Sequence, residues 1–121
     1  MHELAITQSI VESVADHAGG RPVRRVVLEV GTLAGVMTDS ILFCFDLATQ
    51  GTPLEGAVLE IHMVEARARC RACGAVFVQD TLLRSCDCGS HDVERLSGEE
   101  LNIRQYELAP VAARERGEQY V

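Results

Sequence analysis

Residues 70–88 read CRACGAVFVQDTLLRSCDC, and the four cysteines of this stretch decide how the chain is organised. Cys70 and Cys73 form a C-x2-C pair, and after twelve further residues Cys86 and Cys88 form a C-x-C pair. Two thiolates so closely spaced hold one side of a metal ion, and two such pairs complete a tetrahedron, which suits zinc. Four protein ligands leave no open coordination position. The pattern therefore predicts a structural zinc site rather than a catalytic one.

The second cysteine pair leaves an alternative open, because zinc knuckles usually read C-x-x-C and this pair is one residue shorter. His91 lies three residues after Cys88 and is the alternative ligand. Unrelated buried thiols or a redox pair are a weaker reading, given the paired spacing. Cys44 stands apart between Phe43 and Phe45, and we expect it to be a small buried hydrophobic residue.

The composition changes sharply around the cysteines. Residues 67–98 are rich in Cys, Arg, Asp and Gly and contain few large apolar side chains. Such a segment cannot form its own hydrophobic core, so metal binding would supply its folding free energy. We therefore expect an inserted zinc-ribbon-like domain at 67–98, with residues 1–66 and 99–121 forming the main α/β domain.

The first part of the main domain predicts a helix followed by a strand. Residues 3–18 have the periodicity of an amphipathic helix that ends at Gly19 and Gly20. Residues 23–30 then read as a strand with Val26, Leu28 and Val30 on one face. The apolar face of the helix is expected to comprise Leu4, Ile6, Ile10, Val11, Val14 and Ala18.

A second helix is expected from Thr38 or Asp39, either of which is a suitable N-cap, to about Thr49. It is apolar on nearly all sides, which favours a central core helix, with cover by a partner protein as the alternative.

Residues 57–65 alternate as a strand does, and residues 100–108 are also strand-like. The fold class predicted is α+β: two helices and a small mixed three-stranded sheet. We expect the two strands that flank the insertion to lie side by side in that sheet.

Composition bounds the function. The net charge of −7 and the scarcity of aromatic residues (no Trp, two Tyr, three Phe) disfavour a nucleic-acid binder. No apolar stretch approaches the roughly 20 residues of a membrane span, and the first residues do not resemble a secretory signal, so we expect a cytoplasmic protein without a membrane role. A P-loop and an HExxH motif are both absent, which disfavours a nucleotide hydrolase and a zinc hydrolase.

The first residues, Met1, His2 and Glu3, could bind a second metal. The terminal amine, the deprotonated amide of His2 and its imidazole can form fused chelate rings, and planar nitrogen donors suit Ni(II) or Cu(II). Glu3 could add a carboxylate. On spacing alone, however, a histidine near a chain end usually has no such role.

A resemblance changes that assessment. The segments MHELAITQSI (1–10), EVGTLAGVMTDSILFCFD (29–46) and ELNIRQYEL (100–108), together with the cysteine pairs, resemble the HypA/HybF family. These proteins are nickel-insertion accessory factors of NiFe-hydrogenase maturation. The resemblance runs from Met1 to about Leu108 in the same order and spacing. In the family the second cysteine pair is commonly C-P-x-C, and this chain lacks the proline and one residue.

The resemblance implies a nickel metallochaperone and not an enzyme. Transient Ni(II) would be bound at the N-terminus by His2, the Met1 amine and nearby backbone amides, with Glu3 contributing, in a nickel-binding domain of residues 1–66 and 99–121. Asp39 is near where some relatives place an acidic group, although N-capping explains it equally well. The zinc of residues 67–98 would be structural.

The expected partners are the precursor of the NiFe-hydrogenase large subunit and the nickel-handling GTPase of the same pathway; a homodimer is left open. The alternative function is a zinc-ribbon adaptor or nucleic-acid-binding module without a nickel role.

Overall fold

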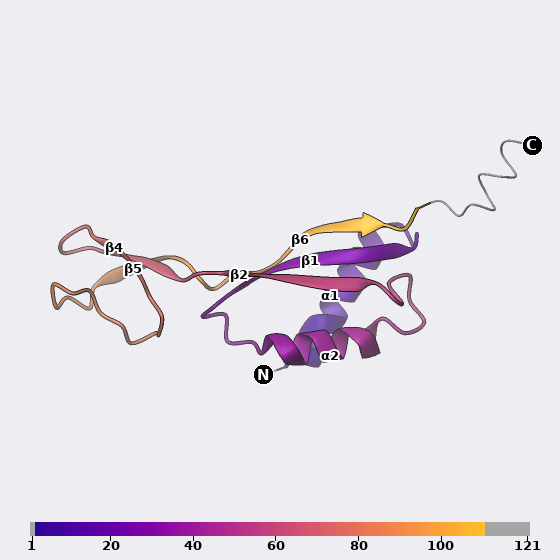
Figure 1. The fold of residues 1–121 in the computed structure, drawn as a ribbon, viewed down its shortest axis with the longest axis horizontal. Coiled ribbons are helices and arrows are strands. Elements are labelled where there is room, and N and C mark those ends of the chain that lie inside the picture. The colour runs from indigo at the N-terminus through magenta and orange to yellow at the C-terminus, as the bar shows by residue number, and fades with distance from the viewer. Residues whose placement is uncertain (1, 111–121) are drawn as a thin grey trace, which may run out of the picture.

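The computed structural model describes residues 2–110, so that Met1 lies outside the described residues. Figure 1 shows an elongated molecule with two helices and a sheet at one end and a second small sheet at the other. This arrangement confirms the predicted α+β class. The elements in chain order are α1 (Glu3–His17), β1 (Val23–Gly31), α2 (Thr38–Ala48), β2 (Val58–Val64), β3 (Arg67–Cys70), β4 (Val76–Val78), β5 (Val93–Ser97) and β6 (Leu101–Leu108).

The main sheet is mixed and has the order β2-β1-β6. β2 runs parallel to β1, with α2 as the crossover between them, and β6 runs antiparallel to β1. The expectation that the strands flanking the insertion are neighbours is wrong, because β1 lies between them. The crossover places β2 on one edge of β1 and leaves the other edge for β6. Both strands meet the insertion at the same end of the sheet, where Gly31 pairs with Val64 and Val30 with Leu101.

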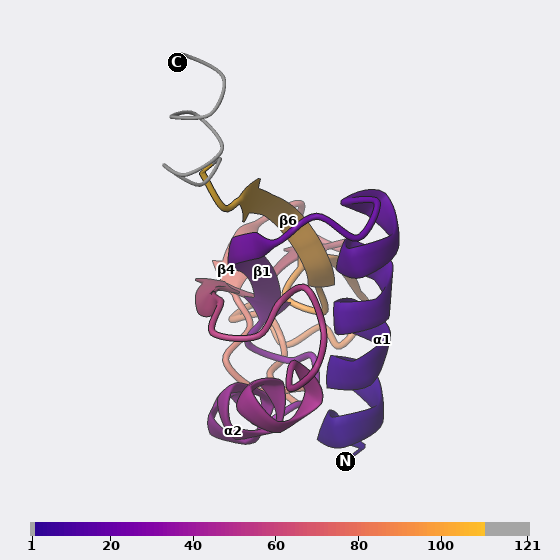
Figure 2. The same cartoon turned by 90° about the vertical axis from the view of Figure 1, so that its right-hand side faces the viewer.

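Both helices lie on one face of this sheet, as Figure 2 shows. The predicted helix over 3–18 is confirmed, but its buried face is rotated relative to the expectation: Leu4 is 47% exposed, whereas Glu3 and Thr7 are buried. The cause is the neighbouring helix, which lies against this end of α1: the Met37 N–H at its start donates to the Glu3 carboxylate, while the Thr7 hydroxyl donates to the Glu3 carbonyl within α1. The core comprises Ile10, Val11, Val14, Ala18, Val23, Val26, Leu28, Val30, Ile41, Phe45, Leu54 and Ala57.

The helix α2 is buried on one side only, so the interpretation as a central core helix is wrong. Ile41 and Phe45 are buried, whereas Phe43 is 67% exposed and Leu47 is 50% exposed. Cys44, expected to be buried, is half-buried. The N-cap is Met37 rather than Thr38 or Asp39, and it makes no side-chain capping bond. The packing of α1 against one flank of α2, and of the sheet behind it, leaves its outer side open.

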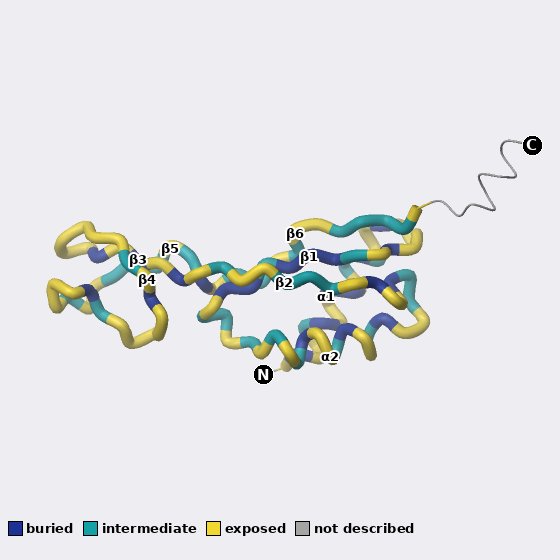
Figure 3. The backbone as a smooth tube through the Cα atoms, in the orientation of Figure 1, coloured by how far each residue is buried: buried dark blue, intermediate teal, exposed yellow. Residues whose placement is uncertain are grey.

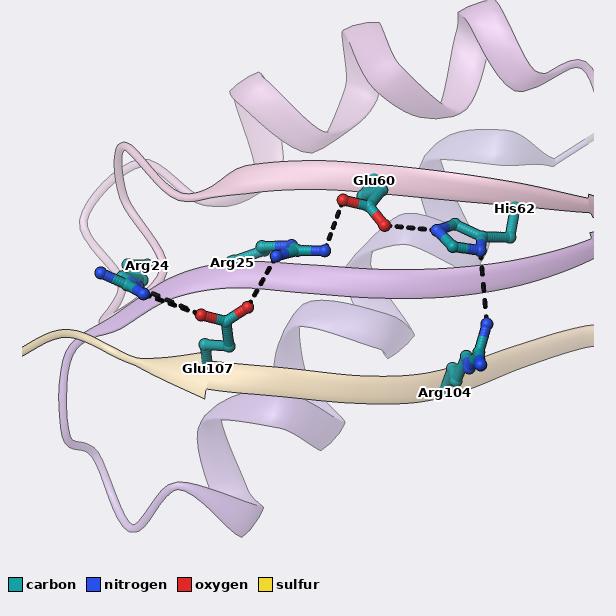
Figure 4. Close-up of polar contacts among 6 residues, drawn as sticks. All are labelled: Arg24, Arg25, Glu60, His62, Arg104 and Glu107. Carbon is teal, nitrogen blue, oxygen red and sulfur yellow. Dashed lines mark hydrogen bonds and ion pairs between the residues drawn. The ribbon is translucent and has the colours of Figure 1, made fainter.

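The opposite face of the main sheet carries a network of charged side chains, drawn in Figure 4. The Glu107 carboxylate of β6 accepts from Arg24 at 2.9 Å and from Arg25 at 2.8 Å. Arg25 also contacts Glu60 on β2, which contacts His62. The network thus links all three strands across the sheet, from one edge to the other.

The second sheet is antiparallel, with the order β4-β3-β5, and its residues belong to the segment predicted as an insertion. Figure 3 shows how few of its residues are buried. The chain passes between the sheets twice, and the loop after β1 contacts both passages: the Leu33 N–H donates to the Gly98 carbonyl at 2.8 Å, and the Ala66 N–H donates to Thr32 Oγ1 at 3.3 Å. The division into two domains at 67–98 stays a prediction.

Candidate metal centres

The four cysteines converge at the far end of the second sheet. Cys70 ends β3 and Cys73 follows it in a turn, while Cys86 and Cys88 lie in the loop between β4 and β5. The first turn is closed by the Gly74 N–H donating to the Cys70 carbonyl at 2.8 Å. The second is closed by the Gly89 N–H donating to the Cys86 carbonyl at 2.9 Å, one residue tighter than the first. The shorter C-x-C pair therefore still forms a knuckle.

The geometry of the sulfur atoms fits one zinc ion. All four Sγ atoms lie within 4.8 Å of one another. The Sγ atoms of Cys70 and Cys88 are 3.6 Å apart, as are those of Cys73 and Cys86. Zinc–sulfur bonds of about 2.3 Å in a tetrahedron give sulfur–sulfur separations of about 3.8 Å. His91 is exposed and does not belong to this group.

The thiols differ in their proton affinity. The backbone N–H of Cys73 lowers the pKa of Cys70 to about 6, against the opposing effect of burial. The Ser90 N–H lowers the pKa of Cys88, but the thiols of Cys70 and Cys86 outweigh it and raise that pKa to about 11. One thiolate therefore forms readily and discourages the ionisation of its neighbours. A divalent cation would reverse this effect, because the ion stabilises all four thiolates together.

The residues predicted to bind nickel lie where α1 and α2 begin. His2 is exposed and is the N-cap of α1. Glu3 is buried at 9% exposure, and its Oε2 accepts a hydrogen bond from the backbone N–H of Met37 at 3.1 Å. This N–H holds the pKa of Glu3 below its usual value, against the opposing effect of burial. The ionised Glu3 side chain thus links the start of α1 to the start of α2 through this hydrogen bond.

Asp39 lies in the first turn of α2, two residues after Met37, and is exposed. It is thus at the same end of the helical layer as His2 and Glu3. Among residues 2–110, however, the four cysteines are the one group of three or more potential ligand side chains already gathered around a common point. The ligand sets for nickel and zinc stay predictions.

Sequence reasoning did not identify Met37 as the partner of Glu3. The two residues are 34 positions apart, and the contact uses a backbone N–H, for which the identity of the side chain gives no signal. The sequence offers only an acidic residue at a helix start, and its burial becomes known from the structure alone.

Comparison with known proteins places the chain in a family. A family model described as "Hydrogenase/urease nickel incorporation, metallochaperone, hypA" matches residues 1–108. The chain belongs to the HypA family. The proteins named hydrogenase maturation factor HypA include one from Trichormus variabilis, 50% identical over 92% of this chain and 98% of its own length. Another, from Geotalea uraniireducens, is 48% identical over 89% of this chain and 99% of its own length. The resemblance to HypA/HybF is thereby confirmed, as is the assignment to hydrogenase maturation factors.

Solved structures support the fold. The solution structure of the nickel metallochaperone HypA from Helicobacter pylori is similar with a TM-score of 0.62, covering 89% of this chain and 97% of that one. A second solution structure of a HypA protein gives a TM-score of 0.64 and covers 90% of this chain. Both are 23% identical in sequence, so the likeness concerns the fold. Within residues 2–110, no helix has the length and apolar character that a membrane span requires.

Proposed function

We propose that this HypA-family protein binds Ni(II) transiently at its N-terminus and delivers it to the precursor of the NiFe-hydrogenase large subunit. The observation that carries the proposal is the position of His2, exposed and directly before the first turn of α1. A backbone amide at that place has no carbonyl partner within the helix. The His2 amide and imidazole, together with the Met1 amine, can therefore coordinate one metal ion through three nitrogen atoms.

The donor set suits a metal that must be released. Amine, amide and imidazole nitrogens favour Ni(II) and Cu(II) over hard cations, and an exposed end of the chain lets a recipient approach the ion. The cysteine site has the opposite character: four sulfurs within 4.8 Å of one another would enclose an ion and leave no position for a recipient. We assign transient nickel to the N-terminus and structural zinc to Cys70, Cys73, Cys86 and Cys88.

Glu3 contributes by holding the N-terminal residues in place. Its carboxylate is tied to the Met37 N–H, which fixes the start of α1, and with it His2, against the start of α2. Asp39 is exposed at the same end and could supply an acidic neighbour to the ion. This arrangement limits the conformational entropy that the ligands lose when the metal binds.

The proposal also covers the cellular setting. As a metallochaperone rather than an enzyme, the protein would work in the cytoplasm, where the hydrogenase precursor and the nickel-handling GTPase of the pathway would be its partners. The family description names urease as well as hydrogenase, and urease is therefore a second candidate recipient.

Nickel titration of the untagged, zinc-loaded protein tests the proposal. We expect about one Ni(II) per chain by calorimetry, and loss of that site in His2→Ala and in a variant with residues added before Met1. His17→Ala is the matched control, because His17 is exposed at the other end of α1 and bonds to the Ser13 carbonyl. Unchanged nickel binding in the extended variant would contradict the N-terminal site.

A further inference from the structure

The outer side of α2 carries an unusual concentration of exposed apolar side chains. Phe43 and Leu47 lie four residues apart and therefore share one side of the helix. Leu42 is also exposed and is separated from them around the helix by Asp39 and Asp46. Leu4 and Met37 are exposed at the adjoining helix starts, which the Glu3–Met37 hydrogen bond joins. We call these five apolar residues the α2 patch. Their exposed fractions are 47% for Leu4, 65% for Met37, 41% for Leu42, 67% for Phe43 and 50% for Leu47.

Two carboxylates lie within the α2 patch, and the helical layer around it has neither Lys nor Arg. Asp39 lies one turn before Phe43 and Asp46 lies one turn after it, and both are exposed. Residues 1–20 and 26–66, which include both helices, contain neither Lys nor Arg. All arginines of the described chain lie in the turn at Arg21, on the main sheet or in the second sheet and its loops. The helical layer thus combines apolar anchors with negative charge.

The exposed apolar side chains and the carboxylates of the α2 patch together indicate what kind of molecule could bind there. A second copy docked α2 against α2 would bring Asp39 and Asp46 of both copies together with no nearby cation to compensate, and like charges across an interface are unfavourable. An amphipathic helix with leucine-like side chains on one face and Lys or Arg beside them satisfies both features. We propose that the α2 patch is the docking surface for a positively charged amphipathic helix of a partner protein.

The position of the patch gives this docking a consequence for delivery. Leu4 follows Glu3 in the chain and Met37 is hydrogen-bonded to it, so a helix that covers these two residues lies close to His2 and Glu3. If the proposed nickel site is correct, the partner that docks here is brought next to the metal. The docking itself does not depend on nickel, so the two proposals can fail separately.

The experiment uses the zinc-loaded full chain without nickel and two synthetic helical peptides of about 18 residues. One has Leu along one face and Lys elsewhere; the other has Glu in place of every Lys. We expect fluorescence anisotropy to show binding of the Leu/Lys peptide only. Amide shifts in a titration followed by NMR should concentrate on residues 37–47 and on the start of α1. Binding should weaken as salt is raised, because salt screens the attraction between the peptide's Lys side chains and Asp39 and Asp46.

Variants locate the binding. Phe43→Ser combined with Leu47→Ser should weaken binding of the Leu/Lys peptide by about tenfold or more, since central apolar anchors carry most of an interface's energy. Asp39→Asn with Asp46→Asn should weaken it less and flatten its salt dependence. The matched control is Leu82→Ser with Leu83→Ser, which removes exposed leucines from the second sheet's loop and should leave binding unchanged. All these side chains are exposed, so the variants should fold; thermal melting checks this.

Three results would overturn the proposal. The first is equal binding of the Leu/Lys and Leu/Glu peptides. The second is a shift map centred on the arginine-bearing second sheet instead of α2. The third is a concentration-dependent dimer of the unmodified protein, seen by light scattering and lost in the Phe43→Ser, Leu47→Ser variant, which would make a second copy the occupant. The same variant should bind nickel normally, which separates docking from metal binding.

Discussion

At the scale of single residues, the cysteine site shows what sequence patterns can and cannot settle. The spacing of Cys70 and Cys73 is enough to predict one zinc knuckle. The presence of a second cysteine pair is enough to predict a group of four sulfurs. The pair Cys86 and Cys88 left His91 as a rival, because a pattern does not show whether a turn shortened by one residue still aims both sulfurs inward. In the structure the tighter turn closes on Gly89 and both sulfurs lie at the common point, which favours four sulfur ligands. The ligand set itself stays a prediction.

Replacement of single ligands should separate the four-sulfur assignment from its rival. Cys88→Ser or Cys70→Ser should lose zinc and, with it, the ordered structure of residues 67–98, because metal binding supplies the folding free energy of that segment. His91→Ala should keep its zinc. Elemental analysis of the purified variants gives the zinc content, and amide NMR spectra report the local fold. Loss of zinc in His91→Ala together with its retention in Cys86→Ser would show that the assignment is wrong.

At the scale of elements, the two helices and the three strands of the main sheet could be predicted closely from the sequence, but their environments could not. The three short strands β3, β4 and β5 were not predicted, because residues 67–98 lack a clear apolar alternation. The periodicity of residues 3–18 and the alternation of residues 57–65 follow from local geometry, which is why their types and bounds were found. The side of a helix that faces the core depends on what packs against it. Phe43 looked like a core residue because nothing in the sequence shows that its side of α2 has no cover within the chain.

The ion network on the bare face of the main sheet makes the stability of this element depend on pH. Hydrogen bonds from Arg24 hold the pKa of Glu107 below its ordinary value of 4.5, against desolvation, with Arg25 adding to the effect. A depressed pKa in the folded protein means that the carboxylate stabilises the fold above the unfolded-state pKa. This stabilisation is lost as the pH falls from about 4.5 through the folded-state value.

Glu107→Gln should therefore unfold at lower urea concentration than the unmodified protein at pH 7, and the gap should close as the pH falls below about 4.5. Comparing the two proteins at each pH removes the effect of zinc release in acid, which both share. Glu12→Gln, on the exposed side of α1, is the control and should show no such trend. A gap that is the same at pH 7 and pH 3 would mean that the Glu107 charge does not stabilise the sheet.

At the scale of the whole molecule, the arginines of residues 2–110 are kept out of the helical layer: they lie in the turn at Arg21, on the main sheet and in residues 67–98. Residues 67–98 contain five arginines and four acidic residues, whereas the helices of the main domain have acidic residues and neither Lys nor Arg. The overall charge of −7 does not reveal this division, because it sums acidic and basic residues over the whole chain. The topology places the two acidic helices on one face of the main sheet and places the arginine-rich residues 67–98 beyond the end of that sheet.

The junction between the two sheets should be the most sensitive point of the whole molecule. Gly98 has a φ of 113°, and a methyl group there would overlap the side chain and backbone of Ala66, while Gly31 packs directly on the Gly98 backbone. Gly98→Ala should therefore lower the free energy of unfolding by about 2–4 kcal/mol, through overpacking in addition to backbone strain.

Gly56→Ala separates the two causes, because Gly56 also has a positive φ, 79°, but nothing lies near enough for a methyl group to meet. That variant should lose only about 1 kcal/mol in urea unfolding. In Gly98→Ala, amide shifts should also change on both sides of the junction, at residues 31–33 and 65–68, because the two chain passages are bonded to the same loop. Equal losses in the two variants, without those shift changes, would mean that the close packing at the junction does not hold the two sheets together.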